Sequence, residues 1–209
     1  NPAGLELETF QPESTYDALN RPMSTTLPAG TLLESTYNKG GYLENLRAQI
    51  MGQGSFKNFL TGQDYDAKGQ KQWVKYGNET ITKYFYEAKT FRLSNLITVD
   101  KNNKALQDLH YKYDPLGNIM EVRDDAQDTL YYNNGIISPQ KQYEYDHLNR
   151  LTSATGREHA GTGAMIPSNE DFAHLQGLPH QHIQNAVREY TQTYEYDAVD
   201  NITSMAHRT

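Results

Sequence analysis

The 209-residue chain is polar and acidic: 36% of its residues are hydrophobic, its mean hydropathy is −0.82 and its formal net charge is −7. This balance excludes ordinary nucleic-acid binding, because phosphate contacts need clustered Lys and Arg, whereas the cations here are scattered. The chain has no cysteine, which excludes disulfides and cysteine-based zinc or nucleophile chemistry. No run approaches the length of a membrane-spanning helix, so we predict no membrane span and no nucleic-acid partner.

One short pattern recurs seven times: a tyrosine, then usually Asp or Asn, then two residues, then usually Gly or Asn. The copies begin at Tyr16, Tyr37, Tyr65, Tyr86, Tyr113, Tyr145 and Tyr196. The second residue is Asp17, Asn38, Asp66, Glu87, Asp114, Asp146 or Asp197, and the fifth is Asn20, Gly41, Gly69, Thr90, Gly117, Asn149 or Asp200. Internal repetition of this kind indicates an array of one small supersecondary unit.

Each copy is predicted to be one β-hairpin. The Asp side chain can accept hydrogen bonds from the backbone two residues on, which starts a type I turn, and a fifth-place Gly or Asn supplies the left-handed residue that follows. Thr90 fits that place poorly. Four later copies carry a second tyrosine two residues earlier, on the same strand face, at Tyr84, Tyr111, Tyr143 and Tyr194.

The returning strand is predicted to place an apolar residue near the tyrosine. That residue falls six positions beyond the tyrosine, at Leu43, Ile119, Leu151 and Ile202. We expect polar side chains on adjacent strands to bond the tyrosine hydroxyls. Leu46, Ala48 and Ile50 fit both helical and alternating spacing, and the repeat favours a strand for this stretch.

The copies follow one another at short intervals, and a single hairpin is only marginally stable in water. Neighbouring hairpins are therefore predicted to pair edge to edge. The predicted fold is mainly β, an array of antiparallel β-hairpins that forms a curved or spiralling β-strip over residues 1–155. We read the whole chain as a fragment of a longer array, whose unpaired strand edges would favour self-association.

The longest interval, between Tyr145 and Tyr196, is predicted to hold a Gly-rich and helical insertion at residues 156–190. A capping box begins at Ser168, and Ile183, Ala186, Val187 and Tyr190 recur at helical spacing. This places a short helical insertion near residues 168–190. Residues 191–209 then form the last, truncated repeat.

Few residues suggest chemistry beyond structure. His180 and His182 are candidate metal ligands, but a solvated or packing role is the favoured interpretation, and we expect no cofactor. Trp73 and Tyr76 are a candidate aromatic platform for a sugar ring, with a core role as the alternative. Two sequons, Asn78-Glu79-Thr80 and Asn201-Ile202-Thr203, are potential glycan acceptors, although such triplets are common by chance.

Two stretches carry a family resemblance: Tyr111-Lys112-Tyr113-Asp114-Pro115-Leu116-Gly117-Asn118-Ile119 and Tyr143-Glu144-Tyr145-Asp146-His147-Leu148-Asn149-Arg150-Leu151. They resemble the tyrosine–aspartate (YD) repeats of Rhs proteins. Residues 154–159, 177–180 and 194–202 are similar to the cocoon-forming B and C components of bacterial Tc toxins. In that family the repeats form a β-strip that spirals into a hollow shell around a toxic C-terminal polypeptide.

The resemblance implies a non-enzymatic shell segment of a secreted or cell-surface bacterial toxin. Its partners would be the remaining repeats and the enclosed toxin polypeptide. A carbohydrate or cell-surface binding module is the alternative, and an enzymatic reading rests only on the histidines. Asp114-Pro115-Leu116-Gly117 superficially matches the family's self-cleavage element, but it occupies the turn of an ordinary repeat. We therefore interpret Asp114 as a turn residue.

Overall fold

The structure is a computed structural model that describes residues 12–132, 134–160 and 186–209. In these ranges it contains the following strands and one 3-10 helix: β1 (Glu13–Tyr16), β2 (Pro22–Thr26), β3 (Leu32–Tyr37), β4 (Leu43–Gln49), η1 (Ile50–Gly52), β5 (Lys57–Tyr65), β6 (Lys71–Tyr76), β7 (Ile81–Tyr86), β8 (Leu93–Val99), β9 (Ala105–Tyr113), β10 (Ile119–Asp124), β11 (Leu130–Tyr132), β12 (Gly135–Ile137), β13 (Gln140–Tyr145), β14 (Leu151–His159), β15 (Val187–Tyr196) and β16 (Ile202–Arg208).

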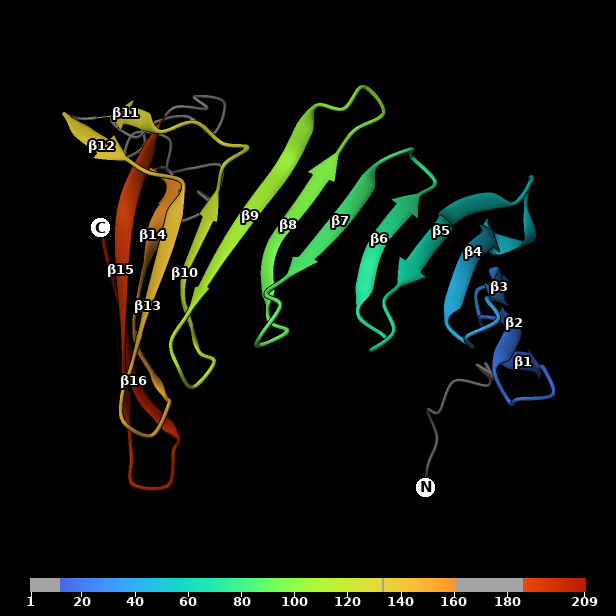
Figure 1. The fold of residues 1–209 in the computed structure, drawn as a ribbon, viewed down its shortest axis with the longest axis horizontal. Helices are drawn as coiled ribbons and strands as arrows, with labels where there is room; N and C mark the ends of the chain where they lie inside the picture. The colour runs from blue at the N-terminus through green and yellow to red at the C-terminus, as the bar shows by residue number, and fades with distance from the viewer. Residues whose placement is uncertain (1–11, 133, 161–185) are drawn as a thin grey trace, which may run out of the picture. The chain divides into compact units, whose positions relative to one another are not determined.

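The strands follow one another through the sheet in chain order. A 14-stranded sheet runs from β1 to β10 and then from β13 to β16, while β11 and β12 form a separate two-stranded sheet (Figure 1). Sequential strands pair antiparallel, as in β3 with β4 and β9 with β10. The prediction of a mainly β protein built from antiparallel hairpins is confirmed.

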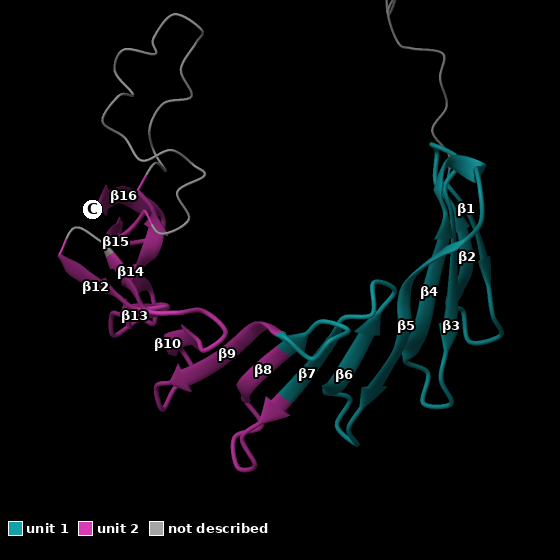
Figure 2. Ribbon diagram, turned by 90° about the horizontal axis from the view of Figure 1, so that it is seen from above, with its two compact units in different colours: residues 1–84, 98–104 teal, residues 85–97, 105–209 magenta. Residues whose placement is uncertain are grey.

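The chain divides into two compact units (Figure 2). The first comprises residues 1–84 and 98–104, and its described part contains β1 to β6 and most of β7. The second comprises residues 85–97 and 105–209, and its described part contains most of β8 and all of β9 to β16. Both units are built from hairpins of the same kind, so the sequence repeat accounts for the strands in each unit.

The register of the hairpins follows the repeat. Tyr37 lies opposite Leu43, and the same spacing of six pairs Tyr113 with Ile119, Tyr145 with Leu151 and Tyr196 with Ile202. A register shift lies next to each of these pairs, which is the mark of a β-bulge beside the turn. The apolar partner predicted for the tyrosine is therefore found on the returning strand.

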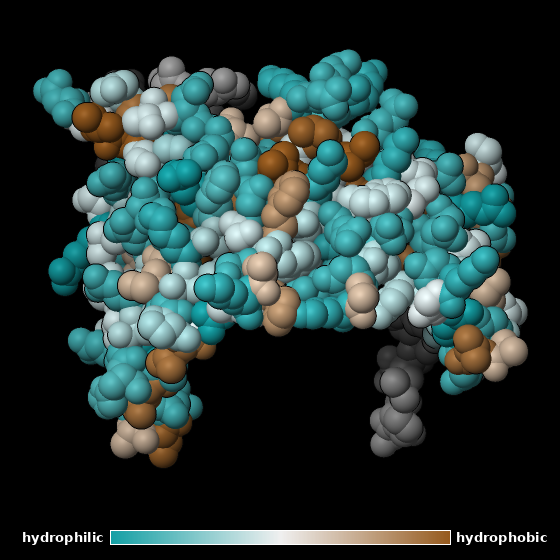
Figure 3. Space-filling view, viewed as in Figure 1, coloured by the Kyte–Doolittle hydropathy of each residue, from teal (hydrophilic) through white to brown (hydrophobic). Residues whose placement is uncertain are grey.

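The apolar core is thin. Among the described residues no large side chain is fully buried, and the buried apolar side chains include Ala48, Leu60, Val74, Ile137 and Ala154. Hydrophilic residues cover most of the face seen in Figure 3. Backbone pairing and partly buried tyrosines therefore hold the strip together, as the polar composition requires.

The predicted limits of the insertion are wrong at both ends. β14 continues to His159 and β15 begins at Val187, so residues near both predicted boundaries belong to paired strands. Val187 and Tyr190 are not helical, because Val187 pairs with His159 and Tyr190 with Gly156. Interstrand bonds outweigh a helical spacing that only a few residues support. Residues 161–185, including the predicted helical segment from Ser168, lie outside the described residues.

Two further local assignments differ from expectation. The stretch from Leu43 is a strand as predicted, but Ile50 begins the 3-10 helix η1. The hairpin of β11 and β12, and the hairpin turn from Asp100 to Lys104, were not anticipated. Asn134, with φ of +62°, and Asn103, with φ of +61°, take the left-handed place in these two turns. The sequence does carry a signal for these two turns, because Asn at a left-handed turn position favours hairpins.

Candidate functional site: the repeat turns and the ladder between hairpins

A side-chain oxygen of the second residue organises each repeat turn, and this group is a carboxylate in every copy except that of Asn38. In the copy that begins at Tyr145, Asp146 Oδ1 accepts hydrogen bonds from the backbone N–H groups of Leu148 and Arg150, at 2.9 and 3.0 Å. The Asn149 N–H donates to the Asp146 carbonyl at 3.0 Å, and Asn149 has φ of +62°. This is a type I turn followed by a left-handed bulge residue.

The same arrangement recurs along the chain. It is repeated at Asp17, Asn38, Asp66 and Asp197, and at Asp114 the Gly117 N–H takes one of the two places on Oδ1. The left-handed residue is the fifth of each pattern: Asn20, Gly41, Gly69, Gly117 or Asp200. The turn at Tyr86 is one residue longer, so Phe91, and not Thr90, is left-handed. The extra residue explains why Thr90 fits poorly.

These hydrogen bonds favour the charged carboxylates. Bonds from the Arg150 backbone and side chain lower the pKa of Asp146, and the Arg21 side chain lowers the pKa of Asp17. For Asp114, burial acts to raise the pKa, but the bonds from Asn118 and Gly117 outweigh it, so the pKa is lowered. The turns are therefore tightest when their acids are ionised.

The repeat tyrosines bond to the preceding hairpin through backbone carbonyls. The Tyr145 hydroxyl donates to the Ile119 carbonyl at 2.9 Å, and Tyr196 donates to the Leu151 carbonyl at 2.7 Å. Equivalent bonds join Tyr37 to Pro22 and Tyr113 to Leu93. The expectation of polar side-chain partners is wrong for these four tyrosines, because the carbonyl beside the preceding turn lies within reach. Tyr194 does bond a side chain, Gln192, at 2.9 Å.

The tyrosine ring is covered by the side chain that follows the preceding turn. The Arg21 guanidinium lies 4.4 Å from the Tyr37 ring centroid, and Arg150 lies 4.8 Å from that of Tyr196. Tyr42 takes this place against Tyr65, with ring centroids 4.3 Å apart. Cation–π and ring-stacking contacts thus add to the hydroxyl bond.

Some of these covering residues also tie successive turns together. Arg150 donates to Asp146 in its own turn, and to the Asp200 carboxylate of the next turn at 2.8 Å. Asn118 likewise donates to Asp114 and, at 3.0 Å, to Asn149. Sequence reasoning missed this position, although a planar or polar residue directly after the left-handed one was a readable signal. We call this set of contacts, together with the tyrosine hydroxyl bonds, the turn ladder.

The other tyrosines of the pattern occupy the expected strands. Tyr16 ends β1 and is 57% exposed. Tyr84 and Tyr86 lie in β7, Tyr111 in β9 and Tyr143 in β13. Burial raises the pKa of Tyr111 and of Tyr143, which shows that the tyrosine face is partly shielded from water.

The two candidate sugar-binding residues do not converge. Trp73 and Tyr76 lie three residues apart in β6, so their side chains leave opposite faces of the strand and form no common platform. His180 and His182 lie outside the described residues. Within residues 12–132, 134–160 and 186–209, no three His, Asp or Glu side chains are placed to hold a metal ion. In the same ranges, no helix is long and apolar enough to cross a membrane.

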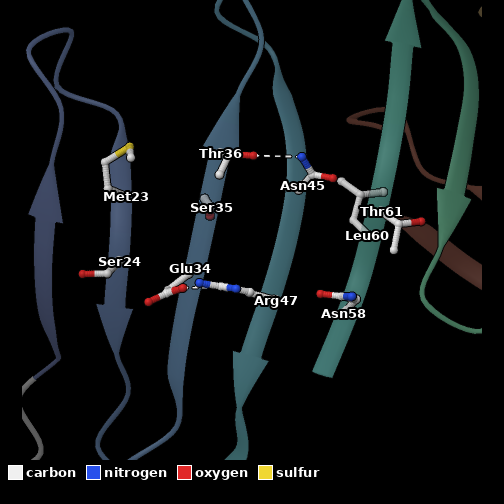
Figure 4. A pocket seen from close by; sticks show the side chains of 10 residues that line it. All are labelled: Met23, Ser24, Glu34, Ser35, Thr36, Asn45, Arg47, Asn58, Leu60 and Thr61. Atoms are coloured by element: carbon white, nitrogen blue, oxygen red, sulfur yellow. Dashed lines mark hydrogen bonds and ion pairs between the residues drawn. The ribbon is translucent and has the colours of Figure 1, made fainter. Parts of the chain in front are cut away.

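A polar groove of about 650 Å³ crosses β2 to β5 (Figure 4). Arg47 pairs with Glu34 at 2.6 Å, and Asn45 donates to Thr36 at 3.0 Å. Ser24, Glu34, Arg47 and Asn58 lie in one registered row. These cross-strand pairs stabilise the part of the sheet that forms the groove.

The comparisons with known proteins agree with this architecture. No family model matches the chain. It is 33% identical over 211 residues to the toxin subunit YenC2 of Yersinia entomophaga, which covers 97% of this chain and 21% of that subunit.

Solved Tc structures share the fold. A crystal structure of TcdB2-TccC3-Cdc42 superposes with a TM-score of 0.75 at 34% identity, covering 95% of this chain and 9% of that one. The Photorhabdus luminescens Tc holotoxin pore gives 0.74 at 35% identity, covering 94% and 9%. The chain thus spans about a fifth of its curated relative, 21% of its length. It belongs to the Rhs/YD-repeat family and resembles the B and C components of bacterial Tc toxins.

Proposed function

We propose that this chain is a wall segment of an Rhs/Tc-like toxin shell that helps to enclose a toxic C-terminal polypeptide. The turn ladder carries the proposal, because it joins successive hairpins into a strip without requiring a thick apolar core. The similarity to YenC2 and to TcdB2-TccC3-Cdc42 supports the same role. The partners would be further repeats and the enclosed polypeptide, in a protein secreted by a bacterium.

The proposed role is structural and not enzymatic. Asp114, which resembles a self-cleavage residue in its sequence context, has both carboxylate oxygens bonded within its own turn: Oδ1 to the Gly117 and Asn118 N–H groups, and Oδ2 to the Asn118 side chain. A carboxylate engaged in this way is suited to hold a turn. Asp114→Asn should accordingly leave any self-cleavage of the parent protein unchanged, and loss of cleavage would count against the structural role.

The shell role can be tested by grafting. The segment of YenC2 that matches this chain is replaced by it, and protease protection of the YenC2 C-terminal polypeptide is measured. We expect protection equal to that of unaltered YenC2. A matched graft carrying Tyr113→Ala, Tyr145→Ala and Tyr196→Ala should lose it, because three ladder bonds are removed. A folded, monodisperse graft whose C-terminal polypeptide is digested as rapidly as the free polypeptide would refute the proposal.

Carbohydrate binding is the second candidate function. Trp73 is 37% exposed, and its ring lies so close to Gly62 that an added Cβ there would come within 3.2 Å of it. An indole laid against the sheet could stack on a sugar, although Tyr76 does not extend this surface. Glycan-array binding that is lost in Trp73→Ala and kept in Tyr76→Ala would support this function. Glycan binding that is unchanged in Trp73→Ala would exclude Trp73 as the binding site.

A further inference from the structure

The turn between β6 and β7 presents an asparagine in an unusual setting. The Tyr76 N–H donates to the Thr80 carbonyl at 2.9 Å, and the Glu79 N–H donates to the Tyr76 carbonyl at 3.0 Å. Glu79 is left-handed, with φ of +67°. The turn is thus a type I turn with a bulge residue, and the sequon Asn78-Glu79-Thr80 lies inside it.

Asn78 is held through its oxygen only. Its Oδ1 accepts hydrogen bonds from the Thr80 hydroxyl at 2.7 Å and from the Thr80 N–H at 3.2 Å. Its Nδ2 donates no hydrogen bond within the described part of the chain, and the residue is exposed. The turn therefore places the sequon hydroxyl against the carboxamide and leaves the nucleophilic nitrogen open to solvent.

An exposed aromatic side chain lies in the strand that leads into the turn. A cavity of about 640 Å³ beside the turn is lined by Lys57, Asn58, Phe59, Tyr76, Gly77 and Asn78. Tyr76 is 37% exposed, and because Tyr76 pairs with Leu60, Phe59 leaves the opposite face of the sheet. Tyr76 is therefore the aromatic side chain available to a hexose on Asn78, and aromatic faces pack well against the C–H face of a sugar.

Gly77 fixes the turn against β5. Its N–H donates to the Phe59 carbonyl at 3.1 Å, and an added Cβ would lie 1.6 Å from the Asn58 carbonyl oxygen. Only glycine permits this approach of the turn to the β5 backbone. The position of Asn78 beside β5 is therefore set by the backbone.

The second sequon provides an internal contrast. Asn201 Nδ2 donates to Asp197 Oδ2 at 2.9 Å, so its nitrogen is engaged in a repeat turn. Two residues before Asn201 stands Val199, where the first sequon has Tyr76. The two sequons thus differ in the freedom of the nitrogen and in the surface available to a sugar.

We propose that Asn78 is an N-glycosylation site, and that the Tyr76 ring packs against the first sugar. In the transfer, Asn78 Nδ2 forms a bond to the anomeric carbon of a nucleotide-activated hexose. The bond from that carbon to the diphosphate breaks, the nucleoside diphosphate leaves with the electron pair, and the amide proton passes to a base of the transferase. This site is independent of the shell role, since it rests on one turn.

The acceptor can be tested with purified protein. The 209-residue chain is incubated with UDP-glucose and a sequon-specific bacterial N-glucosyltransferase, and the modified residue is mapped by peptide mass spectrometry. We expect one hexose on Asn78 and none on Asn201. Thr80→Ala should abolish the modification, whereas Thr203→Ala should not change it. An unmodified Asn78, under conditions where a free peptide with the same sequon is glucosylated, would overturn the proposal, as would equal modification of both sequons.

The packing of the sugar against Tyr76 can be measured separately by thermal melting. Glucosylated protein should melt about 2–4 °C above unmodified protein, the shift expected for a contact of ordinary size in a chain of this length. The shift should vanish in the Tyr76→Ala variant, while transfer to Asn78 continues. A shift that survives in Tyr76→Ala, or no shift in the parent, would refute the packing role.

Discussion

The repeat tyrosine makes two distinct contacts with the preceding hairpin, one through its hydroxyl and one through its ring. Tyr196 shows both, since its hydroxyl donates to the Leu151 carbonyl and its ring lies under Arg150. A polar chain can use such contacts where an aliphatic core is lacking. The tyrosine is thus a connector between hairpins as well as an apolar side chain.

Removing one hydroxyl should therefore have a measurable cost. Tyr145→Phe deletes the 2.9 Å bond to the Ile119 carbonyl and should lower the free energy of unfolding by about 1 kcal/mol. Tyr16→Phe is the matched control, because Tyr16 is 57% exposed and no bond from its hydroxyl to a described residue is present. Urea denaturation measures both. Equal effects in the two variants would contradict the ladder.

The turn acids predict sensitivity to low pH. Hydrogen bonds hold the pKa values of Asp17, Asp146 and Asp197 below their ordinary values in the folded state. Their contribution is therefore complete above the unfolded pKa of about 3.9 and is lost as the pH falls through the lower folded values. We expect the urea midpoint to decline below about pH 4. The decline should be smaller in Asp146→Asn, and an identical pH profile in that variant would count against the assignment.

At the scale of the element, each turn closes its hairpin with one left-handed residue. Gly117 has φ of +109°, and an added Cβ would lie 2.8 Å from Arg92 Nη2. Gly117→Val should destabilise the protein by about 1–3 kcal/mol, the usual cost of a strained backbone.

The matched control for this substitution is Asn20→Gly. Asn20 already occupies the left-handed region, with φ of +60°, so glycine introduces no strain there. The change should stay below about 1 kcal/mol. Thermal melting of both variants tests the hairpin geometry, and unchanged melting of Gly117→Val would contradict it.

At the scale of the whole molecule, the strip exposes strand edges. β1 and β16 each have one neighbour in the described sheet, so each presents unpaired backbone groups. We expect the isolated chain to dimerise or aggregate at high concentration through such edges. Light scattering should show less association for Met205→Lys in β16, because a lysine on an edge strand opposes pairing.

The matched control makes the same substitution on an interior strand. Met120 in β10 is 47% exposed and Met205 is 61% exposed, so both accept lysine without burying charge. Met120→Lys should leave association unchanged. A parent chain that stays strictly monomeric, or an equal effect of both variants, would contradict edge pairing.

The sequence by itself determined the hairpins, because their turns depend on contacts that span only four to six residues. Asp146 reaches no farther than Arg150, and Tyr145 faces Leu151 directly across its own hairpin. Contacts between residues this close in the chain depend on the local sequence, so the sequence alone predicts most of the repeat turns.

Tertiary structure alone decided the contacts between hairpins. The carbonyl that receives the Tyr196 hydroxyl lies 45 residues away, and Arg150 reaches Asp200 across 50 residues. Strand pairing also outweighed the helical spacing of apolar residues that includes Tyr190, because Tyr190 lies in β15 and pairs with Gly156 in β14. These outcomes depend on which strands become neighbours. A short sequence pattern does not specify which strands become neighbours, because that depends on the combined pairing energy of all strands in the sheet.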